Sequence, residues 1–219
     1  MAVKLSGPMV PPLLGGAPTQ AVVLLHGYGS DGQDLIGLAQ YWRDLLPGAL
    51  FVAPNAPERC RDNFSGYQWY PIDYSRPEAR FEGAAAARPV VVEFLADLWA
   101  QTGLGPGATL LGGFSQGAMM ALTVGVSLEA ALGGVLGFSG ALIEPAAWRP
   151  GGGPKPPICL VHGDRDEVVH PELSVEAAKV LREQGYSVSH YVEVGAGHTI
   201  APDGLAFASR FIAEAMGAP

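Results

Sequence analysis

Short apolar runs alternate with longer segments of helical periodicity from residue 21 almost to the end of the chain. Six of these runs are predicted to form strands, at residues 21–25, 50–53, 109–112, 134–138, 158–161 and 188–194. The first five are apolar throughout, which is typical of strands that helices cover on both faces. The alternation of such strands with helices indicates an α/β fold with a mostly parallel central sheet.

Five segments beside these strands are predicted to form helices, at residues 33–45, 82–101, 116–128, 175–184 and 204–216. In the second of them, apolar side chains recur at helical spacing on one face, at Val91, Phe94, Leu95, Leu98 and Trp99. Pro89 lies inside the same segment and removes a helical hydrogen bond, so we expect the helix to begin near it or to kink there.

Length and composition favour a single domain over residues 1–219. The chain is 48% hydrophobic and 16% charged, which excludes a disordered chain and supports one large core. The glycine- and proline-rich segment 149–157 is expected to be a surface loop and not a domain linker, because only about 60 residues follow it.

The charge balance and the cysteines limit the partners and the compartment. The formal net charge is −8 and no basic stretch stands out, so a nucleic-acid partner is not expected. Cys60 and Cys159 lie about 100 residues apart, which indicates no disulfide framework and fits a reducing compartment. No signal peptide and no apolar run near 18 residues is present, so we expect a cytoplasmic protein without stable membrane association.

A candidate nucleophile lies between the strand at 109–112 and the helix at 116–128. The sequence Gly113-Phe-Ser-Gln-Gly117 has the G-x-S-x-G pattern of a nucleophile elbow, in which glycines permit a sharp strand-to-helix turn that exposes Ser115. Ser139 also follows an apolar strand, but Ala141 stands where the second glycine would be and Pro145 prevents a long helix from starting. We therefore expect Ser115 to be the nucleophile and Ser139 to be a strand-end residue near the site.

A serine nucleophile needs a histidine base and a residue that orients it, in the chain order serine, acid, histidine in α/β-hydrolases. His190 lies in a predicted strand and favours a structural role, and His170 precedes a proline and favours packing in a loop. His198 lies in a glycine-rich turn after the last strand, where the backbone can direct an imidazole at the serine. We expect His198 to be the base.

The acid is expected in the loop that follows the strand at 158–161. Asp164 is placed to bind loop amides in an Asx turn, whereas Asp166 is better placed to reach an imidazole, and both could instead cap the loop. A metal site formed by these residues with His162 and His170 lacks the spacing of known motifs and any cysteine ligand, so a metal is not expected.

Two backbone N–H groups are needed to bind an oxyanion. One is expected from Gln116, directly after the nucleophile, and the other from Tyr28, in the glycine-rich loop after the first strand. The glycines of this loop would also suit an ordinary strand-to-helix turn that binds no oxyanion, so this segment alone does not distinguish the two interpretations.

Aromatic residues are concentrated in the segment 58–82. Six of them lie there, namely Phe64, Tyr67, Trp69, Tyr70, Tyr74 and Phe81. They can fill the core beneath a long loop or form the wall of an apolar pocket. In the second case, Phe64, Trp69 and Tyr70 are the expected pocket residues.

Five motifs in order give the chain a likeness to a known family. They are Leu25-His-Gly-Tyr-Gly-Ser-Asp-Gly, Gln68-Trp-Tyr, Gly113-Phe-Ser-Gln-Gly, His162-Gly-Asp-Arg-Asp-Glu-Val-Val and Gly197-His. With these motifs, residues 20–215 resemble the phospholipase/carboxylesterase family, which includes acyl-protein thioesterases and small bacterial carboxylesterases.

This resemblance implies an α/β-hydrolase fold without a metal or organic cofactor, and a chain that can form a homodimer. It also implies that Ser115, Asp166 and His198 are the catalytic triad, with Asp166 in preference to Asp164, and that the amides of Tyr28 and Gln116 bind the oxyanion. Tyr28 replaces the leucine that is common in the family and is expected to narrow the acyl pocket, and Glu167 replaces a usual proline.

A cap domain has little room in this chain. In α/β-hydrolases a lid is usually inserted after the strand that here ends at Phe138, yet only about 19 residues separate Phe138 from the next strand at Ile158. The site is therefore expected to be open, or covered only by the segment 58–82.

The sequence predicts a serine carboxylesterase that acts on a small acyl ester, with thioesters and lysophospholipids as further substrates within the same chemistry. A dienelactone-hydrolase-like enzyme is one alternative, although those enzymes have a cysteine at the elbow. A non-catalytic ligand receptor on a hydrolase scaffold is another, and the intact triad residues argue against it.

Overall fold

The computed structural model describes residues 4–143, 153 and 155–217. Most of the segment 149–157, which is expected to be a surface loop, lies outside these described residues.

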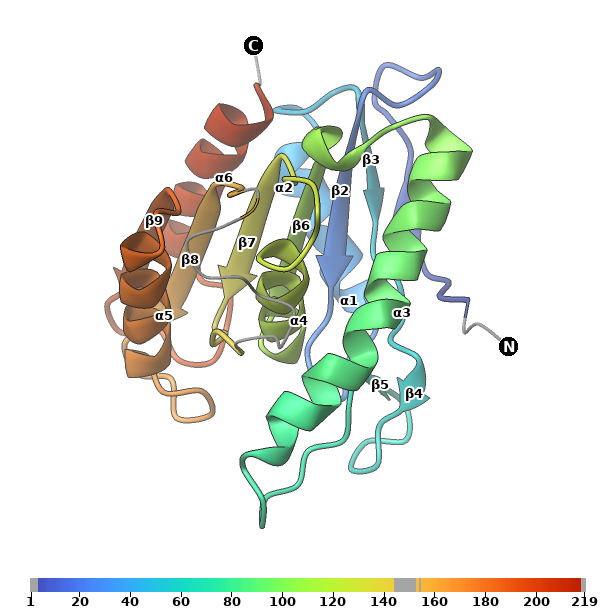
Figure 1. Ribbon diagram of the computed structural model, residues 1–219. Coiled ribbons are helices and arrows are strands. Elements are labelled where there is room, and N and C mark those ends of the chain that lie inside the picture. Colours follow the sequence, from blue (N-terminus) through green and yellow to red (C-terminus); the bar gives the residue numbers. More distant parts are fainter. Residues whose placement is uncertain (1–3, 144–152, 154, 218–219) are drawn as a thin grey trace.

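The centre of the molecule is a seven-stranded sheet in the order β1-β3-β2-β6-β7-β8-β9 (Figure 1). Its strands are β1 Met9–Val10, β2 Gln20–Leu25, β3 Ala49–Val52, β6 Thr109–Phe114, β7 Gly134–Phe138, β8 Ile158–Gly163 and β9 Val188–Glu193. All neighbours are parallel except β1, which pairs antiparallel with β3. The prediction of a mostly parallel sheet is confirmed, and each of the six predicted runs forms a strand.

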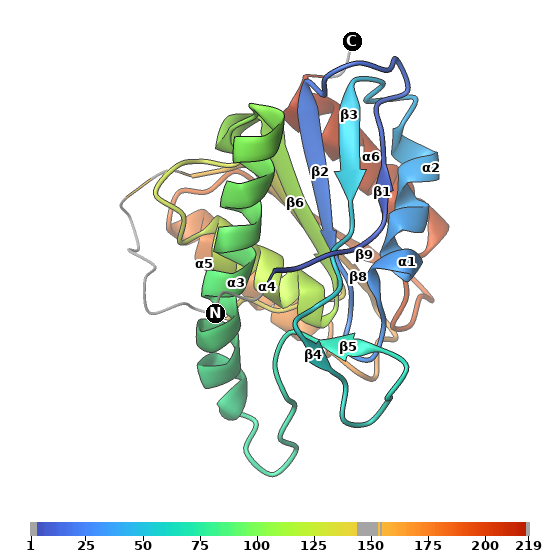
Figure 2. The same cartoon turned by 90° about the vertical axis from the view of Figure 1, so that its right-hand side faces the viewer.

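Three short strands were not predicted. They are β1 at one edge of the sheet and the antiparallel pair β4 Glu58–Arg59 and β5 Tyr67–Gln68. Each has two residues, which is too short for any hydrophobic period to show in the sequence. The β4–β5 hairpin lies beyond the carboxyl ends of β2 and β3 (Figure 2), and a bridge between Ser30 and Tyr67 connects it to the loop after β2.

Helices cover both faces of the sheet, as the apolar strands predict. α3 Ala79–Thr102, α4 Gln116–Gly125 and α5 Glu172–Glu183 lie on one face, and α1 Gly32–Leu35, α2 Ala39–Trp42 and α6 Pro202–Met216 lie on the other (Figure 2). No helix within the described residues is long and apolar enough to cross a membrane.

Two helix predictions differ from the structure. The segment 33–45 is not one helix, because the 3₁₀ turn Ile36–Leu38 separates α1 from α2, and Gly37 inside this turn is a poor helix former. α3 begins ten residues before Pro89 and continues through it. Pro89 and Ala85 are exposed, so water can reach the Ala85 carbonyl that the missing N–H leaves without a helical partner.

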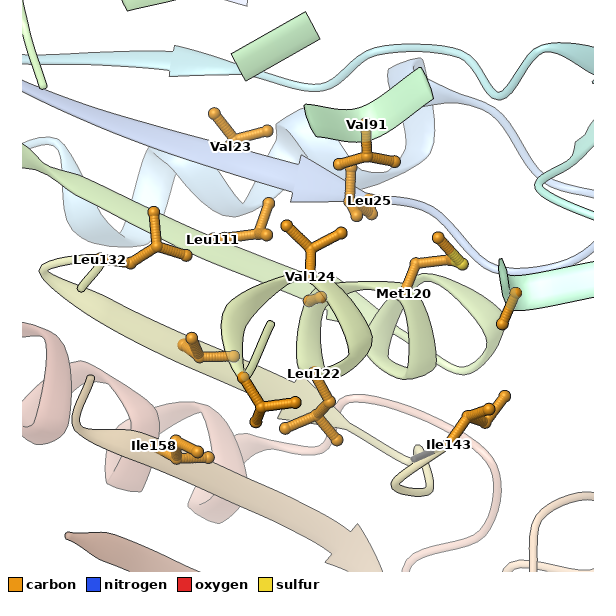
Figure 3. Packing of buried hydrophobic residues seen from close by; sticks show 14 of the residues in the cluster. Val23, Leu25, Val91, Leu111, Met120, Leu122, Val124, Leu132, Ile143 and Ile158 are labelled. Carbon is orange, nitrogen blue, oxygen red and sulfur yellow. The ribbon is translucent and has the colours of Figure 1, made fainter. Parts of the chain in front are cut away.

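The alternation of side chains along the buried strands divides the core into two layers. Val23 and Leu25 of β2 face the layer beneath α3 and α4, where they pack with Val91, Leu111 and Met120 (Figure 3). Val22 and Leu24 of the same strand face the layer beneath α2 and α6. Both faces of the sheet are buried beneath helices. Polar functional side chains are therefore expected in the loops that follow the carboxyl ends of the strands.

Candidate active site

Ser115 occupies a sharp turn between β6 and α4. Its φ of 53° lies in the left-handed region, which is uncommon for a residue other than glycine and costs conformational energy. The backbone N–H of Ser115 donates to the carbonyl of Phe138, 2.9 Å away, which fixes the turn to β7. A side chain at position 117 would place its Cβ 1.9 Å from the Leu25 carbonyl oxygen, so Gly117 is required for the close approach of α4 to β2.

The structure brings Ser115, His198 and Asp166 together from three separate strand ends. Oγ of Ser115 lies 3.0 Å from Nε2 of His198, and Nδ1 of His198 lies 2.7 Å from Oδ2 of Asp166. The three side chains follow β6, β9 and β8, whose carboxyl ends lie at the same edge of the parallel sheet, with β7 between β6 and β8. The serine, the imidazole and the carboxylate therefore form one continuous chain of hydrogen bonds.

The carboxylate of Asp166 is buried and receives donors on both oxygens. Oδ1 accepts the backbone N–H groups of Val168 and Val169, each at 2.9 Å. Oδ2 accepts from His198 and lies 3.1 Å from Nε2 of the buried His162. Burial alone would raise the pKa of this carboxyl group, but the hydrogen bonds from His198, Val169 and Val168 outweigh it and hold the pKa below its ordinary value.

Asp166 reaches the imidazole, as the sequence suggested, but it also forms the Asx-type turn that was expected of Asp164. Asp166 accepts the amides of its own loop in an Asx-type turn. Asp164 is exposed, and its Oδ1 accepts the backbone N–H of Gly195 at 2.6 Å, in the loop that carries His198. Asp164 therefore holds the histidine loop against the acid loop and does not take part in the hydrogen-bond chain.

The two other candidate histidines lie elsewhere. Nε2 of His190, in β9, is 3.2 Å from the Ser174 hydroxyl of α5, and burial, with Arg182 and His162 nearby, lowers the pKa of His190. His170 is exposed and lines the cavity beside Ser115, so the expectation that it packs within its loop is wrong.

Ser139 lies at the end of β7, as expected, with its backbone also in the left-handed region at φ 49°. Its side chain is buried, and its Oγ has no hydrogen-bond partner among the residues that the structure describes. Its backbone N–H donates to the carbonyl of Val161 at 2.8 Å. Ser139 therefore connects β7 to β8, and no base among the described residues is hydrogen-bonded to its hydroxyl.

Two residues that line the cavity beside Ser115 have a backbone N–H without a hydrogen-bond partner among the described residues. Tyr28 and Gln116 both line this cavity, and neither backbone N–H donates a hydrogen bond within the described part of the chain. Gln116 is the first residue of α4, so its N–H also lies at the positive end of the helix dipole. Both amides are available to an anion that forms next to the serine.

A buried histidine holds the loop that carries Tyr28. Nδ1 of His26 lies 2.8 Å from the carbonyl oxygen of Gly27, and Nε2 lies 2.9 Å from the backbone nitrogen of Ala56. Since the Ala56 N–H donates to Nε2, the proton of the neutral ring is on Nδ1, which donates to Gly27. Burial lowers the pKa of His26 and favours this neutral form.

Sequence reasoning did not find the contributions of His26 and His162. A signal was present, because each histidine follows a buried apolar run at the carboxyl end of a strand and precedes a glycine, in Leu25-His26-Gly27 and Val161-His162-Gly163. The repeated His-Gly pair marks the two loops that meet at the site.

The side chain of Gln116 fixes one wall of the cavity. Its Oε1 accepts the backbone N–H of Trp69 at 2.9 Å, and its Nε2 donates to the carbonyl of Tyr70 at 2.8 Å. The Trp69 indole is buried and donates to the carbonyl of His26 at 2.9 Å. Trp69 therefore lies behind the wall and links it to the loop after β2.

The cavity beside Ser115 has a volume of about 540 Å³. Its lining is mainly apolar and includes Pro71, Ile72, Tyr74, Met119, Val168 and Leu173. Of the three aromatic residues expected in its wall, Tyr70 lines it, whereas Trp69 is not part of the lining and Phe64 points into solvent with 83% of its surface exposed. The segment 58–82 thus contributes both to the core and to the cavity.

The Tyr28 side chain also lines this cavity. Its hydroxyl donates to Oδ2 of Asp62 at 2.9 Å, across to the β4–β5 hairpin. Desolvation and the neighbouring Cys60 and Asp62 raise the pKa of this tyrosine, so the hydroxyl remains a donor. No group of three His, Cys, Asp or Glu side chains among the described residues is arranged to hold a metal ion.

The fold and the serine at its carboxyl edge define a hydrolase of the α/β class. A profile described as phospholipase/carboxylesterase matches residues 15–216, and the chain belongs to this family. The resemblance seen in the five motifs is therefore confirmed, and the protein is a hydrolase of the carboxylesterase and acyl-protein thioesterase kind.

Three relatives illustrate the breadth of the family. Acyl-protein thioesterase 1 of Saccharomyces cerevisiae is 31% identical, over 90% of this chain and 93% of its own. Esterase YpfH of Escherichia coli is 30% identical, over 86% of this chain and 80% of its own. Esterase PE8, whose crystal structure is known, is 51% identical in sequence to this chain. The two structures superpose with a TM-score of 0.92, over 97% of this chain and 99% of the PE8 chain.

Proposed function

We propose that the protein is a serine esterase in which Ser115, His198 and Asp166 form the catalytic triad. The observation that carries this proposal is the continuous hydrogen-bond chain from Oγ of Ser115 through His198 to the buried Asp166. A serine hydroxyl is a weak nucleophile until a base removes its proton, and Nε2 of His198 is within hydrogen-bond distance of that proton.

The reaction proceeds through an acyl-enzyme. Ser115 Oγ attacks the ester carbonyl carbon while His198 takes the hydroxyl proton, and the developing oxyanion accepts the N–H groups of Tyr28 and Gln116. Asp166 holds the Nδ1 proton and stabilises the imidazolium. His198 then protonates the leaving group, and water, activated by the same imidazole, releases the carboxylic acid.

The cavity beside Ser115 supports an acyl ester with an apolar acyl group as the substrate. Its mainly apolar lining would hold the acyl chain, and the nearby amides fix the carbonyl oxygen. We favour a small ester, while the similarity to acyl-protein thioesterases extends the proposal to thioesters, whose hydrolysis uses the same groups. A lactone hydrolase with a cysteine nucleophile has less support, because Cys60 and Cys159 are both buried outside the elbow.

The proposal is tested with p-nitrophenyl esters from acetyl to palmitoyl and with a fluorophosphonate probe. Ser115→Ala is expected to reduce ester hydrolysis by about 10³-fold or more and to abolish labelling. Ser139→Ala is the matched control, because it removes a nearby serine hydroxyl that has no base beside it, and it should hydrolyse and label like the wild type. Substantial hydrolysis or labelling in Ser115→Ala would overturn the assignment.

A further inference from the structure

A second, smaller cavity also borders the catalytic imidazole. Its volume is about 280 Å³, and its lining comes from α1, the 3₁₀ turn, the end of β6 and the loop of His198. The residues other than His198 are Asp34, Leu35, Leu38, Phe114, Thr199 and Ile200. Ser115, Tyr28 and Gln116 line the larger cavity, and His198 is the residue common to both linings.

The lining of the second cavity combines an apolar surface with one negative charge. Among the described residues that form it, Asp34 carries the formal charge, and its exposed carboxylate accepts the Ser30 hydroxyl at 2.8 Å. The Phe114 ring forms part of the same lining, with its centroid 4.8 Å from that of His198. A carboxylate, an aromatic ring and aliphatic side chains that line one cavity form a combination that can bind an organic cation.

The chemistry of ester cleavage indicates which part of a substrate this cavity would receive. When the bond between Ser115 Oγ and the acyl carbon has formed, the bond from that carbon to the alcohol oxygen breaks, and the proton on Nε2 of His198 moves to that oxygen. The alcohol oxygen must therefore lie beside the imidazole. With the acyl group in the larger cavity next to Ser115, the rest of the alcohol can continue past His198 into the second cavity.

We propose that the second cavity is the subsite for the leaving alcohol and that Asp34, with the Phe114 ring, makes it select alcohols that carry a positive charge. This inference rests on the proposed esterase function and adds the substrate class to it. An ammonium alcohol is favoured over a neutral alcohol of the same shape, and an alcohol that carries a sulfonate or phosphate is disfavoured. The net charge of −8 also attracts cationic substrates and repels anionic ones.

The test uses three butyrate esters that differ only in the alcohol, with rates followed by acid release. The alcohols are choline, 3,3-dimethylbutanol, which has carbon in place of the charged nitrogen, and 2-hydroxyethanesulfonate. At low ionic strength, kcat/KM for the choline ester should exceed that for the neutral ester about three- to tenfold, as expected for one charge at a partly exposed site. The sulfonate ester should be the poorest substrate, and 0.3 M salt should reduce the differences.

Two variants assign the preference to this cavity. Asp34→Asn keeps an oxygen that can accept from Ser30 and should bring the ratio of choline to neutral ester to about one. Thr199→Lys adds a positive charge at an exposed position of the lining and should bring the ratio below one. Glu176→Gln removes an equal charge from the exposed surface of α5 and should keep the wild-type ratio.

The outcomes separate this inference from the proposed function. If the wild type hydrolyses the neutral ester but shows no preference for the choline ester, or if Asp34→Asn keeps the preference, the subsite assignment is wrong and the esterase remains. If the wild type hydrolyses neither these esters nor the p-nitrophenyl series, the proposed function fails and the subsite assignment fails with it.

Discussion

The carbonyl oxygen of Gly27 lies 2.8 Å from Nδ1 of His26, and the peptide unit to which it belongs carries the N–H of Tyr28. A peptide unit is planar and its C=O and N–H point in opposite directions when it is trans. The imidazole therefore fixes the direction of the Tyr28 N–H, which is one of the two proposed oxyanion donors. The hydrogen bond also polarises the unit and makes this N–H a stronger donor.

Two substitutions at His26 separate its two hydrogen bonds. His26→Asn can place an amide N–H near the position of Nδ1 and keep the bond to Gly27, whereas His26→Gln can place an oxygen near Nε2 and keep the bond from Ala56. We expect kcat on p-nitrophenyl butyrate to fall about tenfold or more in His26→Gln and much less in His26→Asn, with KM little changed.

Thermal unfolding of both His26 variants is the control. Each variant leaves one buried partner unsatisfied, so both should lose stability by about 1–3 kcal/mol. Equal losses of kcat in the two variants would show that the histidine only supports the fold.

His162 allows a similar experiment on the acid side of the site. Its Nε2 lies 2.7 Å from the Val169 carbonyl and 3.1 Å from Oδ2 of Asp166, so one N–H serves both oxygens. His162→Leu removes this donor, and kcat should fall about tenfold, in line with a hydrogen bond to a charged group of about 1.5 kcal/mol. KM should change little, because His162 does not line the cavity beside Ser115.

The matched variant is His162→Gln, whose amide can again place an N–H between Val169 and Asp166. Most of the lost kcat should return in this variant. A full activity in His162→Leu, or no recovery with glutamine, would contradict a role for this histidine in orienting Asp166.

The sequence predicted the strands that form by burial of an apolar run, and it missed the short elements that form by pairing with another segment. Buried parallel strands such as β2 and β8 each contain a continuous apolar run, so their positions were evident in the sequence. β1 and the β4–β5 hairpin form by pairing with a partner segment, and two residues carry no periodic signal. The break between α1 and α2 was also missed, because the apolar spacing continues across Gly37.

At the site, the sequence identified the reactive residues that stand in a distinctive glycine-rich context. Ser115 was marked by its flanking glycines and His198 by its glycine-rich turn. The contacts that position the site could not be predicted. His26 and His162 bind backbone atoms, those of Gly27, Ala56 and Val169. Nearly every residue has the same backbone groups, so the residue type does not show which of them a side chain binds. Phe64 was selected by residue type alone, and it lies outside the cavity.

Tyr28 makes a prediction about acyl-chain length. Its ring lines the cavity beside Ser115, and its hydroxyl is fixed by Asp62. Tyr28→Leu keeps the backbone N–H and removes the ring from this lining, so the ratio of kcat/KM for p-nitrophenyl octanoate to that for butanoate should rise about fivefold. Tyr41→Leu, which replaces an exposed tyrosine of α2, should leave the ratio unchanged, and a fall in the ratio for Tyr28→Leu would show that the ring binds the longer chain.

The pH dependence of stability follows from the buried histidines. The pKa values of His26 and His190 are lowered from 6.5, mainly by burial, so below pH 6.5 the unfolded chain binds protons that the folded protein does not. The stabilising contribution is complete above pH 6.5 and is lost as the pH falls from 6.5 to the lowered values. Asp166, whose pKa is lowered from 3.8, adds a further loss only at a more acidic pH.

Urea unfolding at pH 8, 6.5 and 5 measures this effect. The contribution of the two histidines to the free energy of unfolding should be similar at pH 8 and 6.5 and lower at pH 5. His190→Gln can keep the bond to Ser174 without a titrating ring, so it should reduce the loss between pH 6.5 and 5, whereas His170→Gln, at an exposed position, should not. The same loss in His190→Gln as in the wild type would show that this imidazole does not contribute to the acid sensitivity of the fold.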